Sequence, residues 1–293
     1  ERKRTKALIS AAVHPNTLET VETYCMGSGT ELIVIPAKDG ITDMTELAIE
    51  LDENVSCFYM QQPNFYGMLE NATELAEMTH AAGAKFIMGV NPISLGVLKT
   101  PADYGADIAV GDGQPLGMPL SFGGPYLGFM AAKSAIARKL PGRIVGETTD
   151  VDGKRAFVLT LQAREQHIRR EKATSNICSN QALCALTASV YMAAMGASGI
   201  YEAASQSMSK AGYMASKLGK IGYTLKFEGS FFHEFVTTSP QPIEKVMSSL
   251  EKEGILGGYP LSGELEGCIL WCCTEQNTKE EIDRAVEILK EVQ

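Results

Sequence analysis

Apolar residues in the first 135 positions fall into short runs that alternate with segments of helical periodicity. Runs typical of buried strands occupy residues 6–13, 31–36, 56–61, 85–90, 107–110 and 127–131, and helical patterns occupy 16–25, 44–51 and 68–82. Strands that alternate with helices through short connections predict a mostly parallel sheet with helices on both faces. Ligands of such sheets bind beyond the carboxyl ends of the strands, so the loops that follow the strands are where a site is expected.

The pattern changes after residue 140. Segments 143–148 and 155–161 flank Asp152-Gly153, a dipeptide that favours a type I′ turn, and predict a hairpin. The stretch 181–195 predicts a helix that ends near Gly196, and we expect it to be buried because most of its faces are apolar. Further helices are predicted at 203–221, 243–253 and 279–292, and strands at 225–227, 231–237 and 269–273. We therefore predict a large α/β domain over residues 1–200, which includes the hairpin and a polar block within 143–180, and a small α+β domain over 201–293.

Composition adds limits on function. Hydrophobic residues make up 45% of the chain and the formal net charge is −9, which describes a soluble globular protein and argues against a nucleic-acid groove. No apolar run is expected to span a membrane and no signal peptide is recognised, so a cytoplasmic protein is predicted. The seven cysteines form no CxxC pair and have no histidine at ligand spacing, so reduced thiols and no metal site are expected. His233 lies in an apolar stretch and is predicted to be packed rather than catalytic.

Two motifs carry chemical information. Residues 105–129 predict a strand, a Gly-rich turn that contains Gln114, a Gly-Gly-Pro loop and a further strand. Residues 162–178 have the sequence QAREQHIRREKATSNIC, which composition alone describes as a charged surface segment. Together the two segments resemble the P-proteins of glycine decarboxylase, which are pyridoxal-phosphate (PLP) enzymes, and the resemblance covers essentially the whole chain.

The resemblance implies a fold type I, PLP-dependent transferase-like architecture. It also implies that two positions that normally bind the cofactor carry other residues in this chain. The Schiff-base lysine position falls on Gln114, whose amide nitrogen is conjugated with its carbonyl and is not nucleophilic. Asn91 stands where an aspartate normally keeps the pyridine nitrogen protonated, and an amide carries no charge to do so. An asparagine before Pro92 is also an ordinary loop residue, so both interpretations of Asn91 stay open.

Other positions follow from the same resemblance. Thr174, Ser175 and Asn176 match a loop that donates hydrogen bonds to the cofactor phosphate held by the partner subunit. Arg164, His167 and Arg170 would line the pocket or the subunit interface, as would His14 and Asn64. For His14, helix capping is a comparable alternative, and for Asn64 the Pro-Asn…Gly sequence on composition alone indicates a turn.

The function implied is that of the lysine-less subunit of a glycine decarboxylase, with PLP held by a lysine-bearing subunit 2, glycine as substrate and the lipoylated H-protein as acceptor of the aminomethyl group. Compared with that family, an N-terminal portion is expected to be absent. Two alternatives remain at this point. One is a catalytically silent scaffold or regulatory protein with the same fold, and the other is an autonomous PLP enzyme that uses Lys85 or Lys99.

Overall fold

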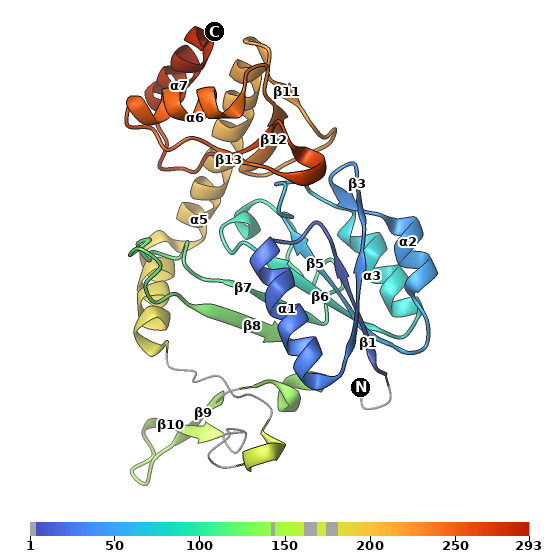
Figure 1. Cartoon of the computed structure of the whole chain (residues 1–293). Helices are drawn as coiled ribbons and strands as arrows, with labels where there is room; N and C mark the ends of the chain where they lie inside the picture. The colour runs from blue at the N-terminus through green and yellow to red at the C-terminus, as the bar shows by residue number, and fades with distance from the viewer. Residues whose placement is uncertain (1–3, 142–143, 161–168, 174–180, 293) are drawn as a thin grey trace.

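Six strands form the main sheet, in the order β2-β1-β5-β6-β7-β8 (Figure 1). The computed structural model describes residues 4–141, 144–160, 169–173 and 181–292. The strands are β1 (Lys6–Ser10), β2 (Glu31–Ile35), β5 (Val55–Gln62), β6 (Lys85–Val90), β7 (Ile108–Asp112) and β8 (Gly128–Ala132). All neighbouring pairs are parallel except β7 with β8, so the predicted mostly parallel sheet is confirmed.

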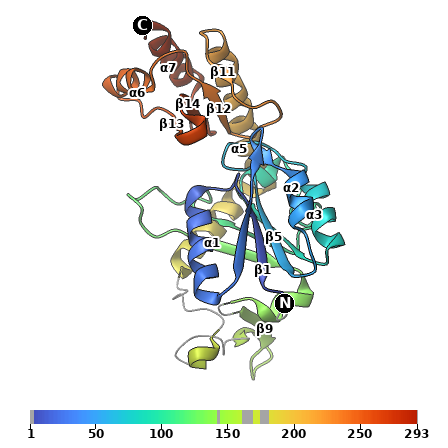
Figure 2. The same cartoon turned by 45° about the vertical axis from the view of Figure 1, so that its right-hand side comes forward.

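Helices cover both faces of this sheet. Helix α1 (Pro15–Ser28) lies on one face, and α2 (Met44–Glu50) and α3 (Ala72–Ala81) lie on the other (Figure 2). Strand side chains such as Leu8, Phe58 and Phe86 are almost fully buried between these layers. Each such side chain contributes about 1.5–3 kcal/mol when it leaves water, so this core holds the strand ends in fixed positions. A small antiparallel ribbon, β3 (Ala37–Lys38) and β4 (Ile41–Thr42), lies before α2.

Helix α3 begins later than the sequence pattern predicts. Residues 68–71 are not helical, because the Leu69 N–H donates to the carbonyl of Ser230 at 2.9 Å and ties this segment to the C-terminal part of the chain. The side chain of Asn71 then caps the first turn. The helix ends just ahead of Gly83, whose φ of +72° gives the left-handed stop that the sequence predicts.

The predicted hairpin is present, but its turn is of another type. Strands β9 (Ile144–Thr149) and β10 (Arg155–Thr160) pair antiparallel. Gly153 has a φ of +76°, whereas Asp152 stays outside the left-handed region that a type I′ turn requires of both central residues. The Gly153 N–H donates to the Asp150 carbonyl at 3.1 Å, and the Asp150 carboxylate accepts the N–H groups of Asp152 and Lys154 at 2.9 Å each. These bonds hold a longer loop in which a left-handed glycine follows the turn.

Helix α5 (Ala182–Gly219) links the two sheets of the chain and is broken at Gly196, which has φ 62° and ψ −178°. The expectation that its first half is buried is wrong, because Leu183, Leu186 and Val190 are 76%, 60% and 60% exposed. An 18-residue window of α5 has a mean hydropathy of 1.5 and is 6% buried. By length and composition alone this helix is apolar enough to cross a membrane, whereas the sequence analysis expected no apolar run of that length. Length and composition do not distinguish a membrane span from a helix that another protein covers.

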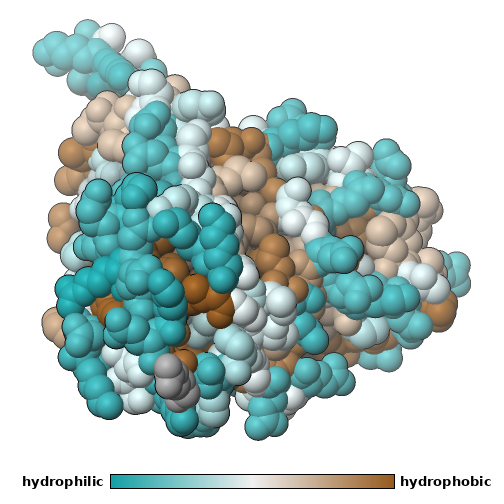
Figure 3. Space-filling view, turned by 90° about the horizontal axis from the view of Figure 1, so that it is seen from above, coloured by the Kyte–Doolittle hydropathy of each residue, from teal (hydrophilic) through white to brown (hydrophobic). Residues whose placement is uncertain are grey.

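The C-terminal part forms a second sheet in the order β11-β12-β14-β13, with two helices packed against it. Its elements are β11 (Thr224–Leu225), β12 (Glu234–Thr238), α6 (Ile243–Lys252), β13 (Tyr259–Pro260), β14 (Cys268–Cys272) and α7 (Lys279–Glu291). The predicted stripe Ile282, Ala285, Val286 and Leu289 on α7 is buried, and Thr278 caps the helix in a capping box with Glu281. Apolar side chains reach the surface mainly in the middle of the face seen from above (Figure 3). The proposed boundary near residue 200 lies within α5, and the division into two domains remains a prediction.

Candidate functional site at the carboxyl edge of the sheet

Four of the residues singled out in the sequence follow four neighbouring strands. His14 comes after β1, Asn64 after β5, Asn91 after β6 and Gln114 after β7. These strands are adjacent and parallel, so their carboxyl ends meet along one edge of the sheet. This edge is the position at which open α/β sheets bind ligands. The topology therefore brings the four predicted residues to one candidate site.

Gln114 occupies a turn that its own amide stabilises. Its side-chain Nε2 donates to the Met118 carbonyl at 2.7 Å, and its backbone N–H donates to the Asp112 carboxylate at 2.8 Å. The Met118 N–H returns a bond to the Gln114 carbonyl at 3.1 Å. Gln114 therefore holds the Gly-rich loop together, and its amide is not a nucleophile.

Asn91 caps the loop after β6. Its Oδ1 accepts the Ile93 N–H at 2.9 Å, and its backbone carbonyl accepts the hydroxyl of Ser94 at 2.8 Å. This is the local side-chain-to-backbone pattern by which asparagine stabilises turns. The oxygen of Asn91 is thus committed to its own loop, and the residue supplies no negative charge for a pyridine nitrogen.

Asn64 is the centre of a buried hydrogen-bond network and is only 1% exposed. Its Nδ2 donates to the Gly40 carbonyl and to Glu70 Oε1, both at 2.8 Å. Its Oδ1 accepts the N–H groups of Tyr66 at 3.0 Å and Met68 at 3.1 Å. A side-chain amide can donate two hydrogen bonds and its oxygen can accept two, so these four bonds use the full hydrogen-bonding capacity of Asn64 inside the protein. Asn64 supports the site and has no polar atom left for a ligand.

Glu70 is a part of this network that the sequence patterns do not reveal. Its other oxygen accepts the Thr42 N–H at 2.9 Å, and its backbone exchanges two hydrogen bonds with the side chain of Gln62. Burial raises the pKa of Glu70, although the bonds from Thr42 and Asn64 act in the opposite direction. Its position within the predicted helix 68–82 made it look like an ordinary charged helix residue. Glu70 is buried because it precedes α3, which begins at Ala72, and lies in the connection from β5.

His14 takes the capping role that was one of the two considered for it. Its Nδ1 accepts the Asn16 N–H at 3.1 Å and so caps helix α1. Its ring also stands edge-on to Phe65, with the ring centroids 5.3 Å apart. Partial burial lowers the pKa of His14, which favours the neutral ring that the cap requires.

Arg170 does not lie at this edge. It begins the short 3-10 helix η3 (Arg170–Lys172), has a left-handed φ of 52° and is exposed. In Figures 1 and 2 this segment lies beside the β9–β10 hairpin, at the end of the molecule where the N-terminus is found. The remaining predicted residues, Arg164, His167, Thr174, Ser175 and Asn176, lie outside the described residues.

The described residues do not fit a covalently held PLP. The position expected to carry the lysine holds an amide, and the position expected to carry the aspartate holds a second amide that is bonded to its own loop. Lys85 lies at the opposite, amino end of β6, where its Nζ is 4.0 Å from a carboxylate oxygen of Asp107. Lys99 lies with its Nζ 5.9 Å from the ring centre of Tyr104. Neither lysine replaces the missing one at the edge of the sheet.

Comparison with known proteins agrees with this arrangement. The family model described as glycine cleavage system P-protein matches residues 1–289. The chain belongs to this P-protein family. Two curated members named "Probable glycine dehydrogenase (decarboxylating) subunit 1" are similar to it. The one from Anoxybacillus flavithermus is 50% identical over 98% of the chain, and the one from Desulfitobacterium hafniense is 48% identical over 99%. The chain spans 65% and 66% of the length of these two P-protein relatives.

Solved structures confirm the fold. A crystal structure of glycine decarboxylase (P-protein) of the glycine cleavage system, in inhibitor-bound form, superposes with a TM-score of 0.93 at 43% identity and covers 99% of this chain and 66% of that one. A NifS-like protein from Rickettsia africae matches with a TM-score of 0.71 at 16% identity, which concerns the fold alone. The family resemblance and the predicted PLP-transferase-like fold class are both confirmed.

Proposed function

We propose that the protein is the subunit of a glycine decarboxylase that lacks the cofactor lysine and that acts together with a second, lysine-bearing subunit. The observation that carries this proposal is the Gln114 amide, which is bonded to the Met118 carbonyl at the position where the family resemblance implies the lysine. PLP bound by the second subunit supplies the electron sink that a decarboxylation of glycine needs. This chain contributes a rigid sheet edge that shapes and closes the pocket.

A surface on α5 supports the presence of a second subunit. Leu183, Leu186 and Val190 lie at positions i, i+3 and i+7 and form one exposed apolar stripe, which we call the α5 outer face. Phe122, in the nearby Gly-Gly-Pro loop, is fully exposed as well. The thiol of Cys184 contacts the Pro125 carbonyl at 3.6 Å, so the loop and the start of the helix are joined. Exposed groups of large apolar side chains mark interaction sites, and we assign this face to the second subunit.

The remaining assignments rest on the family. The substrate is glycine, the aminomethyl group passes to the lipoyl arm of the H-protein, and the complex works in the cytoplasm. Thr174, Ser175 and Asn176 donate hydrogen bonds to the phosphate of the partner's PLP. The names of the curated relatives support the first of these assignments, because they describe a decarboxylating glycine dehydrogenase with numbered subunits.

The test is reconstitution. The protein that carries this chain, the lysine-bearing subunit and their mixture are each supplied with PLP and H-protein, and glycine-dependent exchange of bicarbonate is measured. Activity confined to the mixture supports the proposal, and activity of this chain alone refutes it. Absence of any association with the lysine-bearing subunit supports the silent scaffold instead.

A pair of threonine variants tests the phosphate loop. Thr174→Ala is expected to weaken retention of PLP by the mixed complex, since one hydroxyl donor to the phosphate is lost. Thr23→Ala is the matched control, because Thr23 is exposed on α1 and its hydroxyl donates to the Glu19 carbonyl of the same helix. Equal retention of PLP by both variants would contradict the assignment of this loop to the partner's cofactor site.

A further inference from the structure

A group of metal-ligating side chains lies where β12 begins and β14 ends, next to the loop that carries Asn64 and Gly67. His233, Glu234 and Cys272 each offer one ligand atom, and these atoms all lie within 4.8 Å of one another. The set supplies one nitrogen, one oxygen and one sulfur. The sequence spacing does not reveal it, because the cysteine is far from the other two residues along the chain.

Strand pairing places the residues together. Glu234 is directly opposite Cys272 in the antiparallel register of β12 and β14. The Cys273 N–H donates to the His233 carbonyl at 2.9 Å, so the adjoining Glu234–Cys272 pair is of the non-hydrogen-bonded type. Facing side chains lie closest in such pairs, with their Cβ atoms roughly 4.5–5.5 Å apart. The carboxylate and the thiol therefore meet on one face of the sheet.

One of the three groups has a buried polar atom without a partner in the part of the chain that the structure describes. The Nδ1 of His233 is buried and has no hydrogen-bond partner among the described residues. Glu234 is half-buried beside the Gly67 loop, and no ion pair within the described ranges involves it. A buried polar atom without a partner is costly, and a bound cation would satisfy the His233 nitrogen and balance the charge of Glu234.

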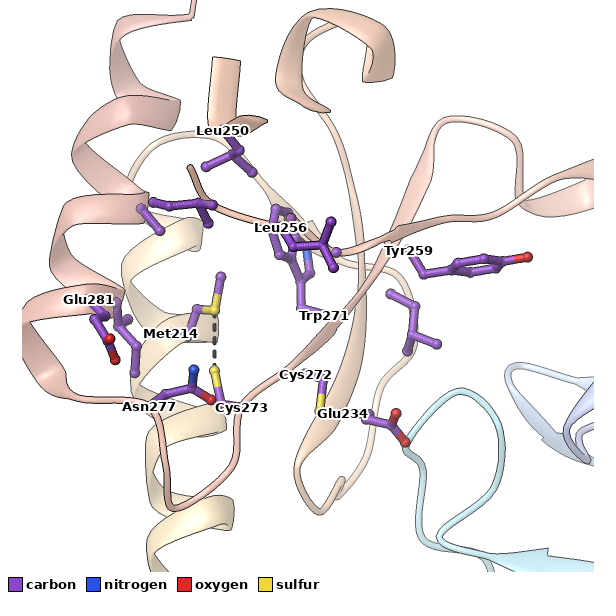
Figure 4. A pocket seen from close by; sticks show the side chains of 16 residues that line it. Met214, Glu234, Leu250, Leu256, Tyr259, Trp271, Cys272, Cys273, Asn277 and Glu281 are labelled. Carbon is purple, nitrogen blue, oxygen red and sulfur yellow. Dashed lines mark hydrogen bonds between the residues drawn. The ribbon is translucent and has the colours of Figure 1, made fainter. Parts of the chain in front are cut away.

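A cavity adjoins the group. It has a volume of about 350 Å³ and is lined by Glu234 and Cys272 together with Trp271 and Tyr259. Figure 4 shows Glu234 and Cys272 side by side on neighbouring strands at the edge of this cavity. Cys272 is exposed, so an ion can reach the site from solvent. Three protein ligands beside an open space match metal sites in which the fourth position is left for water.

We propose that His233, Glu234 and Cys272 bind one divalent transition-metal ion of borderline softness, for which Zn²⁺ is the best match, with water from the cavity as the fourth ligand. Tetrahedral zinc with bonds of about 2.0–2.3 Å holds its ligand atoms roughly 3.5 Å apart. The observed spread of up to 4.8 Å closes by side-chain rotations of about 1 Å at each ligand. The ion would clamp the ends of β12 and β14 next to the loop that carries Gly67.

The experiment uses Zn²⁺ and Co²⁺ alone as probes on the purified protein. Zn²⁺ affinity is measured by competition with a chromophoric chelator, and Co²⁺ binding by its thiolate charge-transfer absorption. The variants are Cys272→Ser and the isosteric Glu234→Gln, with circular dichroism as a check of folding. Cys25→Ser is the matched control, since Cys25 is a partly exposed free thiol on α1, away from the group.

The expected result is one equivalent of Zn²⁺ per chain and a Co²⁺ complex with thiolate absorption. Loss of a hydrogen bond to a metal ligand lowers metal affinity roughly 10–100-fold, and loss of the ligand itself has a larger effect. The Zn²⁺ affinity of Cys272→Ser and of Glu234→Gln should therefore fall at least about tenfold. The Cys25→Ser control should bind as the unchanged protein does. Absence of stoichiometric binding, a Co²⁺ complex without thiolate absorption, or equal affinities across all variants would overturn the proposal.

Discussion

Replacement of Asn64 by alanine tests whether the candidate site is held by the buried network beneath it. The variant loses four hydrogen bonds at once, two donated to Gly40 and Glu70 and two accepted from Tyr66 and Met68. A single hydrogen bond contributes about 0.5–1.5 kcal/mol, and each buried partner left unsatisfied costs about 1–3 kcal/mol. Partial hydration of the half-buried Tyr66 N–H relieves one of these costs, so we expect a loss of about 3–5 kcal/mol in the free energy of unfolding.

Equilibrium urea unfolding followed by far-ultraviolet circular dichroism measures this loss. The control is Asn16→Ala, at an exposed position in the first turn of α1 where only backbone atoms take part in the observed bonds. The double variant with Glu70→Ala should show a coupling energy of about 1–3 kcal/mol, because the two side chains share a bond. A loss below about 1 kcal/mol for Asn64→Ala, or one equal to the control, would refute the assignment of this residue as the centre of the network.

Three further predictions concern other parts of the chain. Gly67→Ala should be destabilising, because its φ is +81° and an added Cβ would clash with the backbone oxygen of Glu234. Comparison of its thermal unfolding with that of Gly254→Ala, at a left-handed glycine with open space around it, isolates the effect of the clash. Burial raises the pKa of Asp107, but hydrogen bonds from Lys133, His80 and the Phe86 N–H outweigh burial, so the pKa is lowered from its ordinary value of 3.8. The carboxylate therefore stabilises the fold fully above pH 3.8, and this stabilisation is lost as the pH falls through the lowered pKa. The difference in unfolding free energy between the protein and Asp107→Asn should therefore shrink below pH 3.8, and a constant difference would contradict this account. Leu186→Glu should weaken binding to the lysine-bearing subunit while leaving the unfolding midpoint unchanged, as titration and circular dichroism would show.

Much of the architecture could be predicted from local patterns. Alternating apolar runs located every strand of the main sheet within a few residues, and the 3.6-residue repeat identified the buried stripe of α7. Gly83 and Gly196 marked the points where helices end or break, because a left-handed conformation favours glycine at such points. These features depend on interactions between residues close together in the sequence.

The errors arose where distant parts of the chain meet. The start of α3 was misplaced because Leu69 pairs with Ser230, a contact that no local pattern contains. Helix α5 was expected to be buried because composition cannot distinguish a helix inside the core from an apolar helix at the surface. The roles of Asn91 and Gln114 as loop caps depend on side-chain direction, and the pairing of Glu234 with Cys272 depends on the register of two strands.

The central claim is that this chain completes a glycine decarboxylase without holding the cofactor itself. Its most direct test is borohydride reduction of the native two-subunit complex loaded with PLP, followed by mass spectrometry of the peptides. The account predicts that the pyridoxyl mass is found on a lysine of the partner subunit and that the peptide with Gln114 is unmodified. A pyridoxyl group on any lysine of this chain would contradict it.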